Sequence, residues 1–290
     1  MPFGQVILGH PGSGKTHYCL AMKEVLTALQ RKPLLINLDP ANEPTETDIT
    51  FDIDIRHLIK LEEVQEELEL GPNGSLMFCL QYVAKNIDWL FKQLKNHSES
   101  YFIIDLPGQV ELYTCHDALS FILNSLNKSG ISLCCVHLVD ASIACTASNF
   151  VSLCLLSLDC FFGIALPTVQ LISKADLLGR GCVFPGRLED FLIPSEPDTI
   201  NHYLNKETGN GRQELNKVVA ELISTTSFLS FGLCSIEEKR TLFDVLCRVD
   251  EALGFIPVGQ QKGITWTIED RAQLIDEFCE RHNEILDKIE

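Results

Sequence analysis

The sequence lacks the features of a nucleic-acid-binding or membrane protein. Its 23 Lys and Arg residues are outnumbered by 40 Asp and Glu residues, which gives a formal net charge of -17. This excess of negative charge disfavours binding to a nucleic-acid backbone or an anionic membrane surface. The apolar stretch 150–166 contains Asp159 and Gly163 and is shorter than a comfortable membrane span. We therefore expect no direct nucleic-acid partner, no membrane partner, and a core helix at this stretch.

Signals for secretion and for a metal cluster are also missing. None of the 12 cysteines forms a Cys-x-x-Cys pair, and the histidines form no His-Glu-x-x-His motif. Cys134 and Cys135 are adjacent within an apolar run, which is typical of small buried side chains. Residues 1–8 lead straight into the first expected strand and leave no room for a signal peptide. We expect reduced thiols in a cytosolic or nuclear protein.

The sequence is organised around Gly-His-Pro-Gly-Ser-Gly-Lys-Thr at residues 9–16. An apolar run at 6–8 precedes it and a helical pattern at 17–29 follows, which is the strand–loop–helix context of a phosphate-binding P-loop. The glycines let backbone amides curl around phosphates, Lys15 would reach the β- and γ-phosphates, and Thr16 would ligate Mg²⁺. The alternative is a glycine turn that merely fits the pattern. The flanking elements favour a nucleoside-triphosphate-binding protein.

Strand and helix signals alternate along the rest of the chain. Strands are expected at residues 34–38, 51–55, 101–105, 133–139, 168–172 and 228–231. Helical stretches separate them, so the sequence predicts an α/β P-loop fold with a mostly parallel sheet flanked by helices. In such sheets, ligands bind beyond the carboxyl ends of the strands. A chain of 290 residues can bury one large core, so we expect a single domain spanning 1–290.

Two regions differ from this alternation. Residues 179 to about 226 begin with a stretch rich in Pro and Gly that lacks a clean period, which predicts a helical or irregular insertion. After an expected helix at 236–253, the tail from Thr267 to about 289 predicts a C-terminal helix capped by Thr267. Its apolar stripe comprises Ile268, Ile275, Phe278, His282, Ile285 and Ile289. We expect this stripe to pack on the same chain, with partner docking as the alternative.

The segment Asp-Leu-Pro-Gly-Gln at 105–109 follows an expected strand, as Asp-x-x-Gly does in GTPases. Asp105 can hold Mg²⁺ through water, and the Gly108 amide can contact the γ-phosphate. Gln109 is the residue type that orients an attacking water, and Glu111 lies two positions further on. Asp39 comes at the end of the strand expected at 34–38 and is a further magnesium or water ligand. A structural turn is the alternative for both segments.

Ser173-Lys-Ala-Asp176 follows the fifth expected strand and corresponds to the Asn-Lys-x-Asp pattern of GTPases. In that pattern the Asp accepts from guanine and the Lys covers the base. Adenine would leave Asp176 unpaired, and an unsatisfied buried acceptor costs about 1–3 kcal/mol. Ser173 replaces the usual Asn, but position and spacing still favour guanine. The residues assigned to GTP binding are Gly12, Ser13, Gly14, Lys15, Thr16, His17, Gly108, Ser173, Lys174 and Asp176.

Several motifs together resemble those of the GPN-loop GTPases. They are Asn37-Leu-Asp-Pro-Ala-Asn-Glu43, Asp54-Ile-Arg56, Gly71-Pro-Asn-Gly74, Asp88-Trp-Leu90 and Asp105-Leu-Pro-Gly-Gln-Val-Glu-Leu112. On composition alone, Gly71-Pro-Asn-Gly74 is only a turn between helical patterns ending at Leu70 and resuming from about 79 to 94. The resemblance instead identifies it as the loop after which the family is named.

The resemblance implies a dimer in which Asn73 of one subunit reaches the phosphate site of the other. It implies that Asn73, Gln109, Glu111 and Asp39 take part in catalysis, and that Thr16, Asp39 and Asp105 hold Mg²⁺. It also implies pairing with a second copy or with a GPN-loop paralogue. It further implies RNA polymerase II subunits or assembly factors as partners and a role in nuclear import. We expect a cytoplasmic location with shuttling to the nucleus.

Two positions depart from the family pattern. His17 follows the P-loop Thr where relatives commonly carry Ser or Thr, and it affects packing or base-side contacts in our interpretation. The segment expected to contact guanine after the sixth strand, Ser230-Phe-Gly-Leu233, lacks the usual proline. Three functions remain open: a GTPase switch, an assembly chaperone that cycles with nucleotide and hydrolyses little, and a small-molecule kinase. Gln109 and Glu111 favour water as the phosphoryl acceptor.

Overall fold

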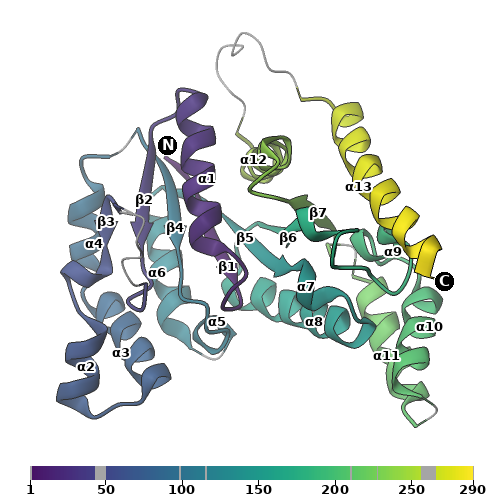
Figure 1. Ribbon diagram of the computed structural model, residues 1–290. Coiled ribbons are helices and arrows are strands. Elements are labelled where there is room, and N and C mark those ends of the chain that lie inside the picture. The colour runs from purple at the N-terminus through teal and green to yellow at the C-terminus, as the bar shows by residue number, and fades with distance from the viewer. Residues whose placement is uncertain are drawn as a thin grey trace. The chain divides into compact units, whose positions relative to one another are not determined.

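The strands of the protein form the α/β sheet that the sequence predicts. The computed structural model describes residues 2–42, 50–97, 99–114, 116–209, 211–226, 228–255 and 266–289. Within these residues the sheet has seven strands in the order β3-β2-β4-β1-β5-β6-β7 (Figure 1). The strands are β1 (Phe3–Gly9), β2 (Pro33–Asn37), β3 (Ile53–Asp54), β4 (Tyr101–Asp105), β5 (Ser132–Asp140), β6 (Thr168–Ser173) and β7 (Phe231–Cys234). Parallel registers join β3, β2, β4 and β1 and also β6 and β7, so the predicted fold class is confirmed.

The chain divides into two compact units. Unit 1 comprises Met1–Val136, Phe162–Thr168 and Val249–Ile256, and unit 2 comprises His137–Phe161, Val169–Arg248 and Pro257–Glu290. The helices that begin in unit 1 are α1 (Lys15–Ala28), α2 (Leu61–Leu68), α3 (Pro72–Lys85), α4 (Ile87–Leu94), α5 (Glu111–Thr114) and α6 (Asp117–Lys128). Those that begin in unit 2 are α7 (Ala141–Ala144), α8 (Ala147–Ile164), α9 (Leu188–Leu192), α10 (Pro197–Thr208), α11 (Gln213–Ser224), α12 (Lys239–Leu253) and α13 (Ile268–Ile289). That residues 1–290 make a single domain stays a prediction.

The core of unit 1 forms where helix α1 packs on the strands. All five residues of β4 are buried, as expected for a strand covered on both faces. Helix α1 buries Tyr18, Met22 and Leu26, which recur at the spacing of one helix face, and it lies along β1, β2 and β4 (Figure 1). Between this helix and the strands, Tyr18 of α1 donates to Gln5 at 2.8 Å, and Gln5 donates to Tyr101 at 2.9 Å. The polar groups of this core are therefore bonded to one another.

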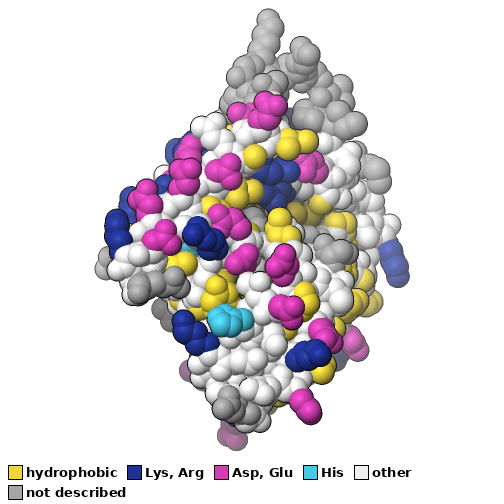
Figure 2. Space-filling view, turned by 90° about the vertical axis from the view of Figure 1, so that its right-hand side faces the viewer, with side chains coloured by type: hydrophobic (Ala, Val, Ile, Leu, Met, Phe, Trp, Pro, Cys, Tyr) yellow, Lys and Arg dark blue, Asp and Glu magenta, His cyan; other side chains and the backbone are white. Residues whose placement is uncertain are grey.

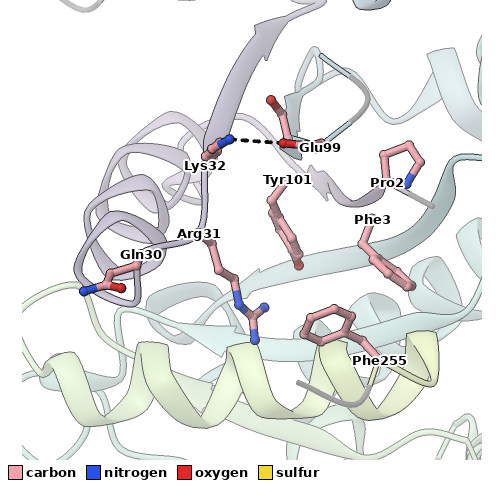
Figure 3. Close-up of a pocket in the computed structure, with 9 residues that line it drawn as sticks. Pro2, Phe3, Gln30, Arg31, Lys32, Glu99, Tyr101 and Phe255 are labelled. Carbon is pink, nitrogen blue, oxygen red and sulfur yellow. Dashed lines mark hydrogen bonds and ion pairs between the residues drawn. The ribbon is translucent and has the colours of Figure 1, made fainter. Parts of the chain in front are cut away.

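A cavity of about 280 Å³ lies at the amino-terminal ends of β1 and β4 (Figure 3). Arg31 lines it and donates to both carboxylate oxygens of Asp250, at 3.0 and 2.6 Å. The Arg31 guanidinium also lies 4.7 Å from the centre of the Phe255 ring. Lys32 and Glu99 form an ion pair of 3.2 Å at its rim. These charged groups thus neutralise one another at the end of the strands away from the P-loop.

Aromatic side chains dominate the core of unit 2. The ring of Phe150 on α8 lies 6.2, 5.0 and 5.7 Å from those of Phe184, Phe191 and Phe231. Among the described residues, α8 is the one helix long and apolar enough to cross a membrane by length and composition. Half of this helix is buried inside the fold. A core helix of a soluble protein can have the same length and composition, so these are weak evidence for a membrane span. The predicted core helix at 150–166 matches this burial.

The insertion is more regular than its composition suggests. Helices α9, α10 and α11 occupy much of residues 179–226. Pro197 lies in the first turn of α10, where the missing N–H of proline costs no hydrogen bond. On α11, the buried Asn216 donates to Asn205 and Thr208 of α10, at 2.8 Å in each case. Pro197 therefore marks a helix start, whereas Pro185 and Pro194 lie outside the helices.

Several predicted boundaries move in the structure. The strand expected at 51–55 shortens to β3 and passes into a 3₁₀ turn, and the helix expected through Leu70 is α2. The segment from 79 to 94 is two helices, α3 and α4, separated at Asn86. The strand expected at 228–231 is wrong by three residues, because β7 begins at Phe231. The alternation of apolar residues locates strands better than it locates their ends.

Helix α13 confirms the predicted tail helix and its cap. The Thr267 hydroxyl accepts from the Asp270 amide at 3.1 Å, and Asp270 accepts from the Thr267 amide at 2.7 Å, which forms a reciprocal cap. The helix packs on unit 2, as expected. The predicted stripe is partly wrong, because Ile268 and Ile289 are 83% and 68% exposed. Phe278 and His282 of the stripe are buried as predicted, and the rest of the buried face is Leu274, Cys279, Asn283 and Leu286.

His282 fastens α13 to the insertion. Its Nε2 accepts from the Phe184 amide at 2.8 Å, and burial lowers the pKa of the imidazole. In the unfolded chain the imidazole takes up a proton near pH 6.5, whereas in the folded protein it does so only at lower pH. The free energy of unfolding therefore falls as the pH drops below about 6.5. We expect His282→Gln to reduce this loss, measured by urea unfolding at pH 7.5 and 5.5. The exposed His202, changed to Gln, is the control and should leave the pH dependence as it is. A wild-type dependence in the His282 variant would contradict the assignment.

Candidate nucleotide-binding site

The predicted P-loop connects β1 to α1. Gly12 and Gly14 have φ angles of 80° and 90°, in the left-handed region that other residues rarely adopt. Gly14 directly precedes Lys15, the first residue of α1. The first amides of a helix have no partner within it, and they carry the positive end of its dipole. The strand–loop–helix context expected from the sequence is therefore present, and it suits phosphate groups.

The loop after β4 lies directly against the P-loop. A Cβ atom added to Gly108 would lie 2.8 Å from Lys15 Nζ and 3.0 Å from the backbone of Pro11. Only glycine allows this approach, which brings Gly108 to the P-loop as predicted. The next residue, Gln109, has a buried Oε1 that finds no hydrogen-bond partner among the described residues. Such an acceptor is suited to a proton of a bound water.

Lys15 is the buried cation of this site. Its side chain is 8% exposed, and Nζ donates to the His10 carbonyl at 3.3 Å. Burial lowers the pKa of Lys15, while the negative charges of Asp105 and Asp39 oppose that shift. Both carboxylates therefore stand near the ammonium group. His17, in the first turn of α1, is exposed, and Ser13 within the loop is buried.

Asp105 and Thr16 meet as the Mg²⁺ assignment requires. The Thr16 hydroxyl donates to Asp105 Oδ2 at 2.7 Å, which leaves its lone pairs free for a cation. Asp105 is 1% exposed and its Oδ1 has no partner among the described residues. Burial, with the charge of Asp39, raises the pKa of Asp105 to about 6. A cation would satisfy this orphaned oxygen, so the residues fit Mg²⁺.

This donor set is not that of an all-protein metal cage. No group of three or more His, Cys, Asp or Glu side chains within the described residues could hold a metal. Mg²⁺ keeps several waters and takes substrate phosphates as ligands, so one or two carboxylates suffice. Asp39 supplies the second carboxylate: its Oδ1 accepts from the Ala41 amide at 2.9 Å, and burial raises its pKa.

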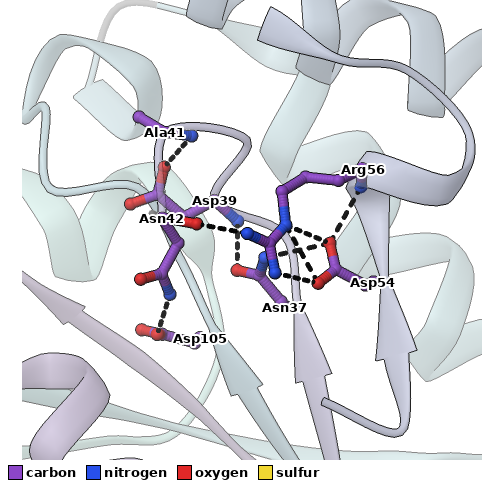
Figure 4. Close-up of polar contacts among 7 residues, drawn as sticks. All are labelled: Asn37, Asp39, Ala41, Asn42, Asp54, Arg56 and Asp105. Carbon is purple, nitrogen blue, oxygen red and sulfur yellow. Dashed lines mark hydrogen bonds and ion pairs between the residues drawn. The ribbon is translucent and has the colours of Figure 1, made fainter. Parts of the chain in front are cut away.

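A polar network that the sequence did not predict lies next to these carboxylates (Figure 4). It joins Asn37, Asp54 and Arg56, quoted there only as motif residues, with Asn42 and Asp105. Arg56 pairs with Asp54 at 2.6 Å and also donates to the Asn42 carbonyl at 2.6 Å. The Asn42 amide donates to Asp105 Oδ2 at 3.2 Å. The signal that could have found it is the position of Asp54 and Asn37 at the ends of adjacent parallel strands.

The GPN segment begins a helix rather than forming a free turn. Gly71 precedes helix α3, Pro72 is its first residue and Asn73 its second. The Ser75 hydroxyl donates back to the Gly71 carbonyl at 3.0 Å and holds this start. The Asn73 side chain is exposed and bonds to none of the described residues. The structure therefore does not bring Asn73 to the P-loop of its own chain.

Glu111 likewise stands apart from the P-loop residues. It is the first residue of the short helix α5, is exposed, and has no hydrogen bond or ion pair within the described part of the chain. Of the predicted catalytic residues, the structure places Gln109 beside Gly108 and Asp39 near Lys15. It does not bring Glu111 or Asn73 to them.

The Ser-Lys-Ala-Asp segment follows β6 in unit 2. Lys174 has a φ of 56° and donates to Asp140 Oδ2 at 2.6 Å. Asp176 Oδ1 accepts from the Ser235 hydroxyl at 2.9 Å, which orients the carboxylate and leaves its other oxygen for a base. The Ser173 hydroxyl donates to the Val139 carbonyl at 3.3 Å. Ser173 therefore ties this loop to β5.

The prediction that segment 230–233 follows the sixth expected strand is wrong, and its contact with guanine stays a prediction. Residues 231–233 belong to strand β7, which pairs with β6 so that Ser173 lies opposite Cys234. The residue beyond the strand end is Ser235, and it is the one that contacts Asp176. Because the strand was predicted three residues too early, the contact of Ser235 with Asp176 was not predicted. The contact of Asp140 with Lys174 was not predicted either, because Asp140 lies on a different strand.

Comparisons with known proteins agree with this geometry. A family model described as "conserved hypothetical ATP binding protein" matches residues 7–255. GPN-loop GTPase QQT1 of Arabidopsis thaliana is 37% identical over 89% of this chain and 87% of its own. GPN-loop GTPase 2 of Danio rerio is 37% identical over 87% of this chain and 81% of its own. A GTPase from Pyrococcus abyssi, solved in its apo form, matches with a TM-score of 0.69 at 20% identity, over 86% of this chain and 97% of that one.

The sheet order and the glycine loop between β1 and α1 define a P-loop nucleotide-binding protein. The extent of identity to its relatives decides the family. This chain belongs to the GPN-loop GTPase family. The family predicted from the motifs is therefore confirmed, and the Pyrococcus structure supports the fold alone.

Proposed function

We propose that this protein is a Mg²⁺-dependent GTPase that acts as a switch in a dimer. GTP binding and hydrolysis follow from its membership of the GPN-loop GTPase family. The observation that carries the Mg²⁺ assignment is the buried Asp105, bonded to Thr16 through one oxygen and unpartnered at the other. Thr16, Asp39 and Asp105 would hold the ion, which supplies charge neutralisation on the phosphates.

The phosphate-binding residues contribute positioning and charge rather than covalent chemistry. The P-loop amides and Lys15 bind the phosphates, and Gly108 brings the loop after β4 against them. The unpartnered Gln109 Oε1 accepts a hydrogen bond from the attacking water and thereby orients it. The unpartnered oxygen of Gln109 suits a water molecule, so water is the phosphoryl acceptor that the residues favour over a small-molecule substrate.

Asp176 supports guanine over adenine, although the matching family model carries an ATP-binding description. Guanine offers two donors to a carboxylate, whereas adenine offers an acceptor at the same position. Ser235 occupies only Asp176 Oδ1, so the carboxylate is oriented and still able to accept. Lys174, held by Asp140, would lie along the base.

Changing Asp176 to Asn tests the choice of base. The Asn side chain keeps an oxygen for Ser235, so the loop should remain folded, but it offers guanine a donor where an acceptor is needed. We expect GTP affinity to fall about 100-fold, as for a lost charged hydrogen bond of up to about 3 kcal/mol, and xanthosine triphosphate affinity to rise. Calorimetry with both nucleotides measures this. Asp159→Asn, on the exposed side of α8, is the control, and equal GTP affinity in the Asp176 variant would exclude guanine recognition by this residue.

The dimer proposal rests on the exposure of the GPN segment. Asn73 is exposed, and Leu68, Leu70 and Tyr82 nearby in sequence are 45%, 37% and 38% exposed. Apolar side chains around an unengaged amide suit a protein interface. We propose that a second copy or a GPN-loop paralogue covers this segment and that Asn73 donates to its phosphate site. Subunits or assembly factors of RNA polymerase II are the proposed clients.

The charge distribution bears on the remaining partners. On the face shown in Figure 2, described acidic side chains lie among basic and hydrophobic ones, and they leave no continuous basic surface there. This supports a protein client rather than a nucleic acid. A cytoplasmic location with nuclear shuttling accompanies the client proposal.

A second function, nucleotide-dependent binding with little hydrolysis, is favoured by one observation. Glu111 and Asn73 are both exposed and disengaged within a single described chain. A lone subunit would then bind GTP and hydrolyse it slowly. Single-turnover release of phosphate, measured at rising protein concentration, separates the two functions, because a dimeric GTPase accelerates with concentration.

A further inference from the structure

Three parallel strands end at the same level beside the P-loop. In the registers, Asn37 of β2 pairs with Asp54 of β3 on one side and with Asp105 of β4 on the other. Two carboxylates and an amide therefore form a row across the carboxyl edge of the sheet. All three are buried, at 5%, 0% and 1% exposure for Asp54, Asn37 and Asp105. Buried polar groups must be bonded, so this row needs partners.

Arg56 supplies the partner of Asp54. Its Nε donates to Asp54 Oδ1 and Oδ2 at 3.0 Å, and Nη2 donates to Oδ2 at 2.6 Å. Asn37 adds a further bond to Asp54 at 3.1 Å. Burial alone would raise the pKa of Asp54, but the hydrogen bonds and charge of Arg56 outweigh it, and the pKa is lowered. Asp54 is thus held ionised as a fixed anchor for the guanidinium.

One guanidinium nitrogen is directed away from this pair. Arg56 Nη1 donates to the backbone carbonyl of Asn42 at 2.6 Å (Figure 4). The side chain of Asn42 in turn donates to Asp105 Oδ2 at 3.2 Å, the same oxygen that Thr16 contacts. A continuous path of hydrogen bonds therefore runs from Asp54 through Arg56 and Asn42 to Asp105.

The same turn also carries Asp39. Its amide donates to Asn37 Oδ1 at 3.0 Å, and its carboxylate accepts from Ala41. Asn37 fixes the beginning of the turn and Arg56 fixes its end at Asn42. Besides the bond from Thr16 to Asp105, both proposed Mg²⁺ carboxylates are therefore oriented by groups that are not among the proposed phosphate or Mg²⁺ ligands.

We propose that Arg56 is a positioning residue for the Mg²⁺ site, acting through Asn42 on Asp105. It would hold the Asp39–Asn42 turn so that the Asn42 amide occupies Asp105 Oδ2 and the other oxygen faces the ion. This inference rests on the proposed Mg²⁺ dependence. Hydrogen-bond partners of ligating carboxylates typically change metal affinity about 10–100-fold when removed.

The variant Arg56→Lys keeps the positive charge but loses the planar, forked set of guanidinium donors. Its ammonium can pair with Asp54, but a single nitrogen cannot also span to the Asn42 carbonyl in the same planar arrangement. Arg56→Lys therefore separates charge from geometry. Asn42→Ala removes the amide that touches Asp105 while leaving the Arg56–Asp54 pair intact.

The measurement is the dissociation of a fluorescent GDP analogue from the full-length protein at buffered free Mg²⁺ concentrations. The Mg²⁺ midpoint for slow dissociation should rise about tenfold in Arg56→Lys and about tenfold in Asn42→Ala. Because Arg56 acts through Asn42, the double variant should also shift about tenfold rather than about 100-fold, since residues in one network are not additive. Melting temperatures in EDTA report folding separately.

Arg31→Lys is the matched control. Arg31 also forms a forked, half-buried pair with an aspartate, Asp250, in the same unit but at the opposite ends of the strands. The Arg31→Lys variant should lower the melting temperature, as Arg56→Lys should, but it should leave the Mg²⁺ midpoint unchanged.

The outcomes separate the inference from the function on which it rests. Dissociation that ignores Mg²⁺ in the wild type would remove the Mg²⁺ proposal itself. A Mg²⁺-dependent wild type with an unshifted Arg56→Lys midpoint overturns the positioning role alone. The positioning role is also overturned if the Mg²⁺ midpoint of the double variant shifts by the product of the two single effects. It is likewise overturned if Arg31→Lys shifts the Mg²⁺ midpoint as much as Arg56→Lys does. If Arg56→Lys does not fold, an unshifted midpoint in Asn42→Ala overturns the proposal and a tenfold shift supports it.

Discussion

Gly108→Ala is expected to reduce GTP hydrolysis about 100-fold, as positional errors of about 1 Å near the reacting groups do. The added methyl would lie 2.8 Å from Lys15 Nζ and 3.0 Å from backbone atoms of Pro11. The Lys15 ammonium is the end of a flexible side chain and can move, but the Pro11 backbone can yield only if the P-loop shifts. Either response displaces a phosphate contact. Single-turnover hydrolysis of GTP at saturating nucleotide measures the loss.

A suitable control exists in a glycine without close neighbours. No atom lies within 4 Å of a Cβ added to Gly181, whose backbone needs no positive φ. Gly181→Ala should hydrolyse GTP at the wild-type rate. If Gly108→Ala does so too, the contact between the β4 loop and the P-loop plays no part in positioning the phosphates.

The parts of this site that are local in sequence could be predicted from it. The P-loop is one strand, one loop and one helix start, so its glycines, Lys15 and Thr16 carry their own context. Asp105 and Gly108 follow a buried strand that apolar periodicity reveals. Their meeting with the P-loop also requires that β1 and β4 be neighbours in the sheet. The registers show that they are, whereas the alternation of elements predicts a parallel sheet without the order of its strands.

The parts that depend on register could not be predicted in the same way. Arg56 acts because Asn37 faces Asp54 across one strand pair and Asp105 across another. A shift of one residue in either pairing would separate these groups, and no pattern in a single sequence measures that shift. Ser235 was missed for a related reason, since the end of β7 decides which residue reaches Asp176.

Helix ends and helix faces were also harder to predict than helices. Pro72 and Pro197 suggested interruptions, yet each lies in the first turn of a helix, where proline is well tolerated. In α13, both isoleucines at the ends of the predicted stripe are exposed, while the polar His282, which the stripe included, is buried as predicted. Its bond to the Phe184 amide accounts for that burial, and such a partner is remote in sequence.

Asn73→Ala is expected to leave GTP binding nearly intact and to slow hydrolysis strongly. The side chain is exposed and forms no hydrogen bond or ion pair with the described residues of its own chain, so the P-loop and Asp176 keep their geometry. A preorganised donor to the transition state contributes roughly 3–4 kcal/mol in comparable sites, which corresponds to a loss of about 100- to 1,000-fold. Calorimetry for GTP and single-turnover phosphate release measure the two effects. The exposed, non-GPN side chain of Gln81 on α3, changed to Ala, provides the control.

Mixing two inactive variants tests whether Asn73 acts across a dimer. Lys15→Ala removes the buried ammonium and with it productive binding in its own subunit, yet that subunit still presents Asn73. In a hybrid, the Asn73→Ala subunit keeps its P-loop and receives Asn73 from its neighbour. Hydrolysis should therefore return on mixing, after time for subunit exchange. If mass measurements show hybrids and no phosphate is released, Asn73 does not complete the site of a second copy. The activating partner would then be a different GPN-loop chain, or Asn73 would serve only the local structure at the start of α3 and take no part in hydrolysis.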